Sequence, residues 1–249
     1  MKRLTARTPW LPFGVDRDAN IRLLCLPHAG AGAISFHAWG KTLPRHIATC
    51  PVQPPGREHR KGEKPLTEVG PLVAELAPVV LAELNSPYAI FGHSTGAICA
   101  FELAREIRRL GGRAPVHLFV AGRPAPHLPL PRTQVALLSP DELAELLRRL
   151  GGTPEELLAD DDFLASIQTL LAADFSLNQG YEYYAEPPLE IPITALGSTA
   201  DNGASIADMA AWEAHTQAGF QLHVITGGHF AVLQRAAEVQ ACIGEALCC

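Results

Sequence analysis

The sequence predicts an α/β fold, in which a mostly parallel β-sheet is flanked by helices and carries a helical insertion, as a single domain over residues 1–249. Short apolar runs alternate with longer amphipathic segments, as strands alternate with helices in parallel sheets. Pro or Gly stands beside many of these segments, where strands and helices stop. A chain of 249 residues also has a length that fits one domain of this class.

The strands are predicted from short apolar runs that end at turn-forming residues. In chain order they are residues 21–26, 47–52, 88–91, 117–120, 193–196 and 222–225. Pro27 follows the first run, and a Pro-Pro-Gly sequence at 54–56 closes the second.

The helices are predicted from amphipathic segments between these runs. They are residues 66–84, 97–110, 206–217 and 231–246. Thr67 is a candidate N-cap of the first, whose end precedes Pro87. Gly111 and Gly112 stop the second.

Residues 122–190 interrupt the alternation. Residues 122–131 are dense in proline and are expected to form an extended loop. Helical patterns follow at 139–150, 154–159 and 161–173, with no strand before residue 193. The sequence therefore predicts an all-helical insertion, either a mobile lid over a site on the sheet or a rigid cap.

Composition excludes several classes of protein. The chain is 47% apolar and 18% charged, with 20 Lys and Arg against 26 Asp and Glu, and lacks an apolar run of membrane-spanning length. The net charge of −6 without basic clusters argues against nucleic acid as a partner. No apolar segment follows the basic N-terminus, so no secretory signal is expected and a cytoplasmic location is predicted. In that compartment Cys25 and Cys99 are expected to be reduced core residues. No cysteine spacing indicates a metal site, and we expect neither metal nor cofactor.

Two glycine-rich segments resemble nucleotide-binding motifs only superficially. Residues 30–35 imitate G-x-G-x-x-G but end in Ser35, and the second strand has no acidic residue to hold a ribose. Residues 56–64 lack the Gly-Lys-Ser/Thr of a P-loop. Dinucleotide and NTPase chemistry are therefore not expected.

The motif that carries chemistry is Gly92-His93-Ser94-Thr95-Gly96. It is a G-x-S-x-G sequence between a predicted strand and a predicted helix, the context of a nucleophile elbow. Such a turn lifts the serine hydroxyl above the sheet, at the positive end of the following helix. Ser94 is therefore the predicted nucleophile.

A serine hydroxyl needs a base, and the base needs an orienting acid. In the α/β-hydrolase order the acid and then the histidine follow the serine. His229 comes after the last predicted strand, and Asp201 follows the strand at 193–196. Both would lie at carboxyl ends of strands, near Ser94, whereas Asp208 and Asp174 are weaker candidates for the acid.

Acyl transfer also needs backbone N–H groups that stabilise an oxyanion. One is expected from Thr95, directly after the nucleophile, and the other from Ala29, in the small-residue loop after the first strand. His28 and His93 flank these groups. We expect them to be structural histidines with satisfied hydrogen bonds rather than catalytic ones.

With these motifs the chain resembles a family, the type II (editing) thioesterases of polyketide and nonribosomal peptide synthesis. The matching segments are residues 24–30, 39–44, 53–57, 91–94, 100–104, 122–127, 150–154, 173–175 and 227–230. Thr95 stands where Met is frequent in the family, and Ala172 where Arg is frequent, which affects the expected pocket shape.

The resemblance implies hydrolysis of acyl groups from the phosphopantetheine arm of acyl or peptidyl carrier proteins, by a monomer through an acyl-serine intermediate. Carrier proteins are acidic, so one alternative is that they bind a basic face of this chain. The other alternative is that the basic residues are ordinary solvated charges. The candidates for that face are Arg57, Arg60, Lys61, Arg123 and Arg132. Two other functions stay open: a small-molecule carboxylesterase or lipase-like hydrolase, and a non-catalytic protein that docks on a synthase.

Overall fold

The computed structural model describes residues 4–248, so the first three residues of the basic N-terminus lie outside the described part. Six strands form one sheet in the order β2-β1-β3-β4-β5-β6, with all neighbouring pairs parallel. In chain order they are β1 (Ile21–Leu26), β2 (Ile47–Pro51), β3 (Tyr88–His93), β4 (Leu118–Ala121), β5 (Ile193–Ser198) and β6 (Phe220–Ile225). The predicted α/β class and all six predicted strands are confirmed.

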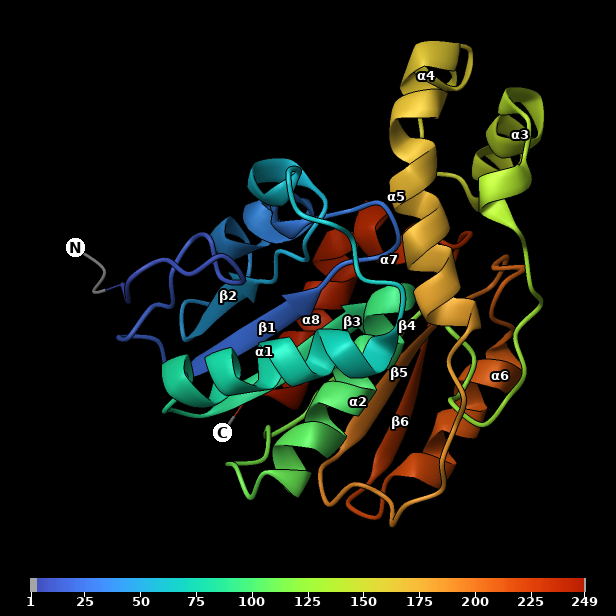
Figure 1. Cartoon of the computed structure of the whole chain (residues 1–249). Coiled ribbons are helices and arrows are strands. Elements are labelled where there is room, and N and C mark those ends of the chain that lie inside the picture. The colour runs from blue at the N-terminus through green and yellow to red at the C-terminus, as the bar shows by residue number, and fades with distance from the viewer. Residues whose placement is uncertain (1–3, 249) are drawn as a thin grey trace.

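Helices cover both faces of the sheet (Figure 1). Helices α1 (Val69–Glu83), α2 (Thr95–Arg109) and α6 (Ile206–Ala210) pack on one face. The opposite face carries the 3-10 helix η1 (Ala33–Lys41), helix α7 (Ala231–Gln234) and helix α8 (Ala236–Ala246). Because both faces are covered, β1, β3, β4 and β5 are buried along their whole length rather than at alternate residues.

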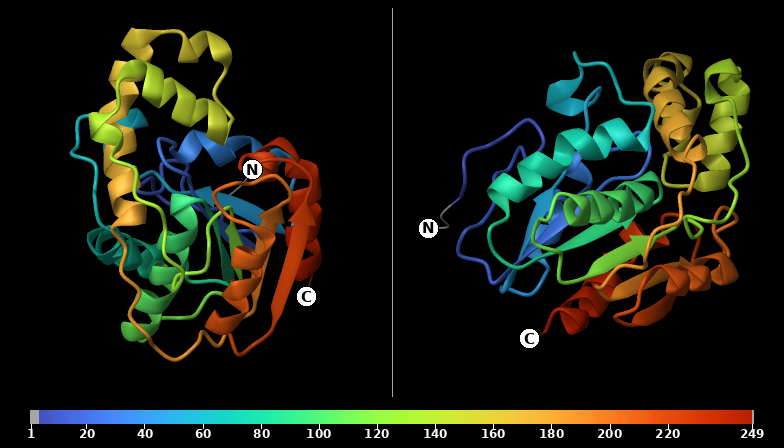
Figure 2. Two further views of the ribbon diagram at one scale, coloured as in Figure 1. Left: turned by 90° about the vertical axis from the view of Figure 1, so that its right-hand side faces the viewer. Right: turned by 60° about the horizontal axis from the view of Figure 1, so that its bottom comes forward.

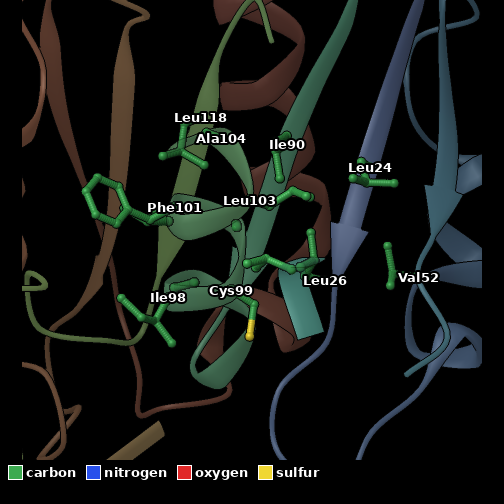
Figure 3. Close-up of a cluster of buried hydrophobic side chains, with 14 of the residues drawn as sticks. Leu24, Leu26, Val52, Ile90, Ile98, Cys99, Phe101, Leu103, Ala104 and Leu118 are labelled. Atoms are coloured by element: carbon green, nitrogen blue, oxygen red, sulfur yellow. The ribbon is translucent and has the colours of Figure 1, made fainter. Parts of the chain in front are cut away.

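The two cores follow the alternation of side chains along each strand. Leu24 of β1, Ile90 of β3 and Leu118 of β4 belong to the buried cluster on the face that α1 and α2 cover, part of which Figure 3 shows. Their neighbours along the chain point to the other face, among them Phe91 and Phe119. Phe91 contacts Phe36 and Trp39 of η1, with ring centroids 5.5 and 5.0 Å apart.

Three helix predictions need correction at their ends. Helix α1 begins at Val69 with Glu68 at the N-cap position, so Thr67 is not the cap. The segment predicted as one helix over 206–217 is the short α6 followed by the 3-10 helix η4 (Ala211–His215). The last predicted helix is broken at Arg235, whose ψ of 42° lies outside the helical range, into α7 and α8.

Between β4 and β5 the chain forms the predicted helical insertion. It contains the 3-10 helix η3 (Val135–Leu137) and helices α3 (Pro140–Leu150), α4 (Glu155–Leu158) and α5 (Asp161–Gln179). Ser139 and Glu142 form a capping box that starts α3. Helix α5 continues six residues beyond the predicted end at 173, because Leu177 adds another buried turn against the sheet-side core.

The insertion has an apolar cluster of its own and stands beyond one end of the sheet (Figure 2). Leu143 and Leu147 of α3 pack with Leu164 and Leu171 of α5. Ala29, in the loop after β1, is partly buried against the same cluster. The insertion is thus joined to the sheet at the loop that the sequence assigns to the oxyanion hole.

Within residues 4–248, no helix combines the length and the apolar character needed to cross a membrane.

Cys25 and Cys99 are buried free thiols, as predicted. Burial raises the pKa of Cys99 to about 12, so this thiol stays protonated and inert at neutral pH.

Candidate active site

Ser94 occupies a sharp turn between β3 and α2. Its φ of 54° and ψ of −119° place a non-glycine residue in a conformation that is strained for an L-amino acid. Backbone hydrogen bonds hold it there: Ser94 N–H donates to the carbonyl of Ala121 at 2.8 Å, and Ala97 N–H donates to the carbonyl of Ser94 at 2.8 Å. Strain maintained in this way is characteristic of a functional position, and it matches the predicted elbow.

The two glycines of the motif are required by close backbone contacts. A Cβ atom on Gly92 would lie 2.2 Å from the carbonyl oxygen of Gly96. A Cβ atom on Gly96 would lie 2.2 Å from the carbonyl oxygen of Leu26, at the end of β1. Both distances are far inside van der Waals contact. The G-x-S-x-G pattern therefore lets α2 start directly against β1 and β3, with Ser94 at the top of the turn.

His229 and Asp201 form a pair across two loops. The Nδ1 atom of His229 lies 2.8 Å from Oδ2 of Asp201. The Asp201 side chain is 1% exposed and that of His229 is 10% exposed. The other oxygen, Oδ1, accepts the N–H of Gly203 at 2.9 Å. Because an ionised carboxylate only accepts hydrogen bonds, this pairing puts the imidazole proton on Nδ1 and leaves Nε2 as a base.

Ser94 and His229 line one cavity of about 450 Å³. Its wall on the sheet side also includes Thr95 and Ala29. The insertion supplies an apolar wall opposite, formed by Leu146, Leu147, Leu150, Phe163, Ile167, Leu171 and Phe175. The Ser94 hydroxyl and the His229 imidazole thus line the same space, which suits an apolar chain.

The two residues assigned to the oxyanion hole lie on this cavity wall. Thr95 is the first residue of α2, and the first N–H groups of a helix have no acceptor within the helix. Ala29 belongs to the loop after β1, where the next N–H group, that of Gly30, donates to Oδ2 of Asp174 at 2.7 Å. The structure therefore brings the five predicted site residues to one cavity or, for Asp201, directly behind it.

His28 and His93 pack beside the site, with ring centroids 5.2 Å apart. His93 Nε2 lies 3.0 Å from the backbone oxygen of His229, to which it donates. Among the described residues, neither Nδ1 atom has a hydrogen-bond partner, so the prediction of fully satisfied histidines is wrong. Burial, with His229 nearby, lowers the pKa of His28 to about 4 and that of His93 well below its usual range. Both rings are therefore neutral at pH 7, so neither places a positive charge beside His229.

The alternative acids have other partners. Asp208 forms a capping box with Ser205 at the start of α6, where its Oδ2 accepts the Ser205 N–H at 2.9 Å. Asp174 pairs with Arg57 through two bonds of 2.7 Å. Neither carboxylate is the partner of His229, a position that Asp201 holds.

The predicted basic face needs correction. Arg57, Arg60 and Arg123 are 6%, 6% and 2% exposed, so they are interior residues. Arg60 pairs with Glu63 at 2.6 Å, and Arg123 donates from Nε to Asn178 at 2.7 Å. The partners of Arg57 and Arg123 lie 117 and 55 residues further along the chain, so the sequence alone does not bring them together, whereas Glu63 is only three residues from Arg60. Lys61 and Arg132 are exposed.

Within residues 4–248, no group of three His, Cys, Asp or Glu side chains is arranged to hold a metal ion.

Residues 21–246 match the thioesterase domain family. Gramicidin S biosynthesis protein GrsT of Aneurinibacillus migulanus is 41% identical over 216 residues, which cover 87% of this chain and 84% of that protein. Two solved structures are similar at 35% identity. The type II thioesterase BorB from the borrelidin biosynthetic cluster has a TM-score of 0.88 over 98% of this chain and 100% of its own. RedJ, a thioesterase from the prodiginine biosynthetic pathway in Streptomyces coelicolor, has a TM-score of 0.86 over 92% and 87%.

Proposed function

Since this chain belongs to the thioesterase domain family, we propose that it hydrolyses acyl thioesters on the phosphopantetheine arm of acyl or peptidyl carrier proteins. It is a thioesterase of the type II kind found with polyketide and nonribosomal peptide synthases, and the editing of carrier-bound acyl groups is the proposed role. The observation that carries the proposal is the joint position of three groups. The strained Ser94 and the imidazole of His229, backed by Asp201, line one cavity under the helical insertion.

In the first half of the proposed reaction, Ser94 Oγ attacks the thioester carbonyl carbon. His229 Nε2 takes the hydroxyl proton, and Asp201 stabilises the imidazolium that forms. The carbonyl oxygen becomes an oxyanion that accepts hydrogen bonds from the N–H groups of Ala29 and Thr95. The C–S bond then breaks, the proton on Nε2 passes to the leaving thiolate, and the acyl group remains as an ester of Ser94.

In the second half, water replaces the thiol. His229 Nε2 takes a proton from water as its oxygen attacks the ester carbonyl, and the same two N–H groups stabilise the second oxyanion. The C–O bond to Ser94 breaks, Ser94 Oγ recovers the proton from His229, and the free acid leaves. Each proton moves between side chains, thiol and water, so the proposed reaction uses no cofactor.

A thioester suits this machinery. A thiol of ordinary pKa, about 8.5, is a better leaving group than an amine, so the general acid has less to supply than in amide cleavage. The apolar side chains of the insertion, Leu147 and Phe163 among them, offer a surface for the acyl chain.

The carrier protein is proposed to dock beside Arg132. This residue is exposed, while its neighbours Pro131 and Thr133 line the cavity. The loop is held in place because Thr133 N–H donates to Oε1 of Gln179 at 2.7 Å. An acidic carrier protein that inserts its phosphopantetheine arm into the cavity would approach Arg132, and the attraction between opposite charges favours association.

The test loads one carrier protein with a series of acyl groups and follows their release by mass spectrometry. Wild type is expected to release them through an adduct of acyl mass on Ser94, and Ser94→Ala to release none above the uncatalysed rate. Ser86→Ala is the matched control, because Ser86 precedes the same strand that Ser94 follows and lies at the other end of the sheet. Normal release by Ser94→Ala would disprove the assignment of the nucleophile.

Two further outcomes distinguish the alternatives. Faster turnover of simple oxygen esters than of the acyl-pantetheine of the same acid would indicate a carboxylesterase. Binding of the carrier without any acyl transfer to Ser94 would indicate a docking protein.

A further inference from the structure

The insertion and the sheet are joined by a buried ion pair. Arg57 lies in the loop after β2 and Asp174 lies on α5, and both side chains are 6% exposed. The contact is bidentate, with Nη1 to Oδ2 and Nη2 to Oδ1 both at 2.7 Å. Such a pair has a fixed geometry, and removing one partner leaves a buried charge unpaired.

The same pair holds the loop that contains Ala29. Asp174 Oδ2 accepts the N–H of Gly30 at 2.7 Å, and Arg57 Nη1 donates to the carbonyl of Ala31 at 3.1 Å. The loop is thus bonded at Gly30 and at Ala31, and the φ of 78° at Gly30 favours glycine.

Helix α5 touches this loop a second time. Leu171 is one turn before Asp174, and a Cβ atom on Gly30 would lie 2.9 Å from its Cδ2 atom. Leu171 also lines the cavity. Helix α5 therefore contacts Gly30 twice, through the apolar side chain of Leu171 and through the carboxylate of Asp174.

The other end of the network is held by the segment that follows β2. Arg57 Nε donates to the carbonyl of Pro55 at 3.2 Å, and Gln53 Nε2 donates to the carbonyl of Arg57 at 3.1 Å. Gln53 Oε1 accepts the N–H of Ala33, at the far end of the same loop, at 2.9 Å. Arg57 is therefore fixed by segments that do not belong to the insertion.

We propose that Arg57 and Asp174 are positioning residues that couple the seating of α5 to the geometry of the oxyanion hole. The inference rests on the proposed function, because it takes the Ala29 N–H as an oxyanion donor. Donors must meet the oxyanion within a few tenths of an ångström to be effective. When α5 is displaced, Gly30 loses its acceptor and the loop loses the contact that fixes Ala29. The hole is then complete only with the insertion seated over the cavity, so thioester cleavage is restricted to that state.

The test separates transition-state from ground-state binding. The probes are an acyl-pantetheine substrate, its non-cleavable thioether analogue, and a pantetheine-linked trifluoromethyl ketone that forms an anionic tetrahedral adduct with Ser94. For Asp174→Ala, kcat is expected to fall about 10²-fold, the loss typical of one oxyanion donor, and the affinity for the ketone to fall in parallel. KM and the affinity for the thioether are expected to change less than about threefold, since they do not depend on an oxyanion.

Two more variants guard against a simple folding defect. Asp174→Asn keeps an acceptor for Gly30 N–H and is expected to lose less than Asp174→Ala. The double variant Arg57→Met, Asp174→Leu leaves no unpaired charge, so it is expected to fold while keeping the loss of kcat and of ketone affinity. Glu63→Ala is the matched control, because it breaks the nearby Arg60–Glu63 pair without touching the loop.

The proposal is overturned if the double variant has wild-type kcat and ketone affinity. It is also overturned if the variants lose affinity for the thioether and the ketone equally, because that would indicate damage to the whole cavity. A failure of the proposed function is distinct from both outcomes: wild type itself would then neither cleave the thioester nor form the ketone adduct.

Discussion

His229 Nδ1 and Asp201 Oδ2 lie 2.8 Å apart although 28 positions of sequence separate the two residues. The pairing depends on β5 and β6 being adjacent and parallel, because each residue follows the carboxyl end of one of these strands. A buried carboxylate in this position fixes both the ring orientation and the tautomer of the imidazole.

Asp201→Asn tests the role of that carboxylate. An asparagine amide donates to Nδ1 and thereby favours the tautomer whose Nε2 carries the proton and cannot accept one from Ser94. We expect kcat for acyl-pantetheine hydrolysis to fall by roughly 10³–10⁴-fold with little change in KM. Asp208→Asn, which alters the helix-capping carboxylate nearby in sequence, is the control and is expected to retain activity. Similar losses in both variants would contradict the assignment.

The elbow is predictable from the sequence because its signal is local. Gly92, Ser94 and Gly96 lie within five residues, and the close approaches that require the glycines involve the adjacent strand end and the start of α2. The positions of Asp201 and His229 are also predictable, because the carboxyl ends of parallel strands meet at one edge of the sheet, and the loops that follow these strands meet there too.

Interior charges are not predictable in this way. The sequence places Arg57 among the surface cations because its partner Asp174 lies 117 residues further along the chain. In the sequence, Asp174 is a weaker candidate for the catalytic acid. Only the position of α5 in the folded protein brings its carboxylate to Arg57 and Gly30. Sequence patterns report which residues are apolar, but burial of an arginine is decided by the partner that tertiary structure supplies.

Gly96→Ala tests the steric origin of the motif. Its Cβ would be 2.2 Å from the Leu26 carbonyl oxygen, so α2 must shift away from β1 or the elbow must distort. We expect a loss of at least about 2 kcal/mol in the free energy of unfolding, together with loss of activity. Gly70→Ala is the matched control, because a Cβ atom on that exposed glycine of α1 would have nothing within 4 Å. Urea unfolding of both variants measures the difference, and equal stabilities would refute the steric explanation.

Arg132→Glu tests the proposed docking site. We expect KM for an acyl group on the carrier protein to rise about 3- to 10-fold, and KM for the same acyl group on free pantetheine to stay unchanged. The effect should shrink at high salt, since exposed charges are screened. Arg45→Glu is the control, because Arg45 is exposed and precedes β2, at the amino ends of the strands and away from the cavity. If both reversals raise KM equally, the site of docking is not at Arg132.

His117 makes the stability of the fold depend on pH. Its Nε2 lies 2.8 Å from Thr194 Oγ1, and its ring stacks on Phe119 with centroids 4.3 Å apart. Burial lowers the pKa of His117 from 6.5 to about 4. Below pH 6.5 the unfolded chain takes up a proton that the folded chain refuses until about pH 4, so folding is favoured fully above this window and less as the pH falls through it.

The variant His117→Gln keeps a hydrogen-bonding side chain beside Thr194 but does not titrate. In the middle of the window its free energy of unfolding is expected to fall with decreasing pH less steeply than that of wild type, by about 1.4 kcal/mol per pH unit for one proton. Urea titrations at several pH values between 6.5 and 4 measure both slopes. His59→Gln, the same substitution at an exposed histidine, is the matched control. A slope for His117→Gln equal to that of wild type would mean that the folded protein takes up the proton, and hence that water reaches the ring of His117 beside Phe119.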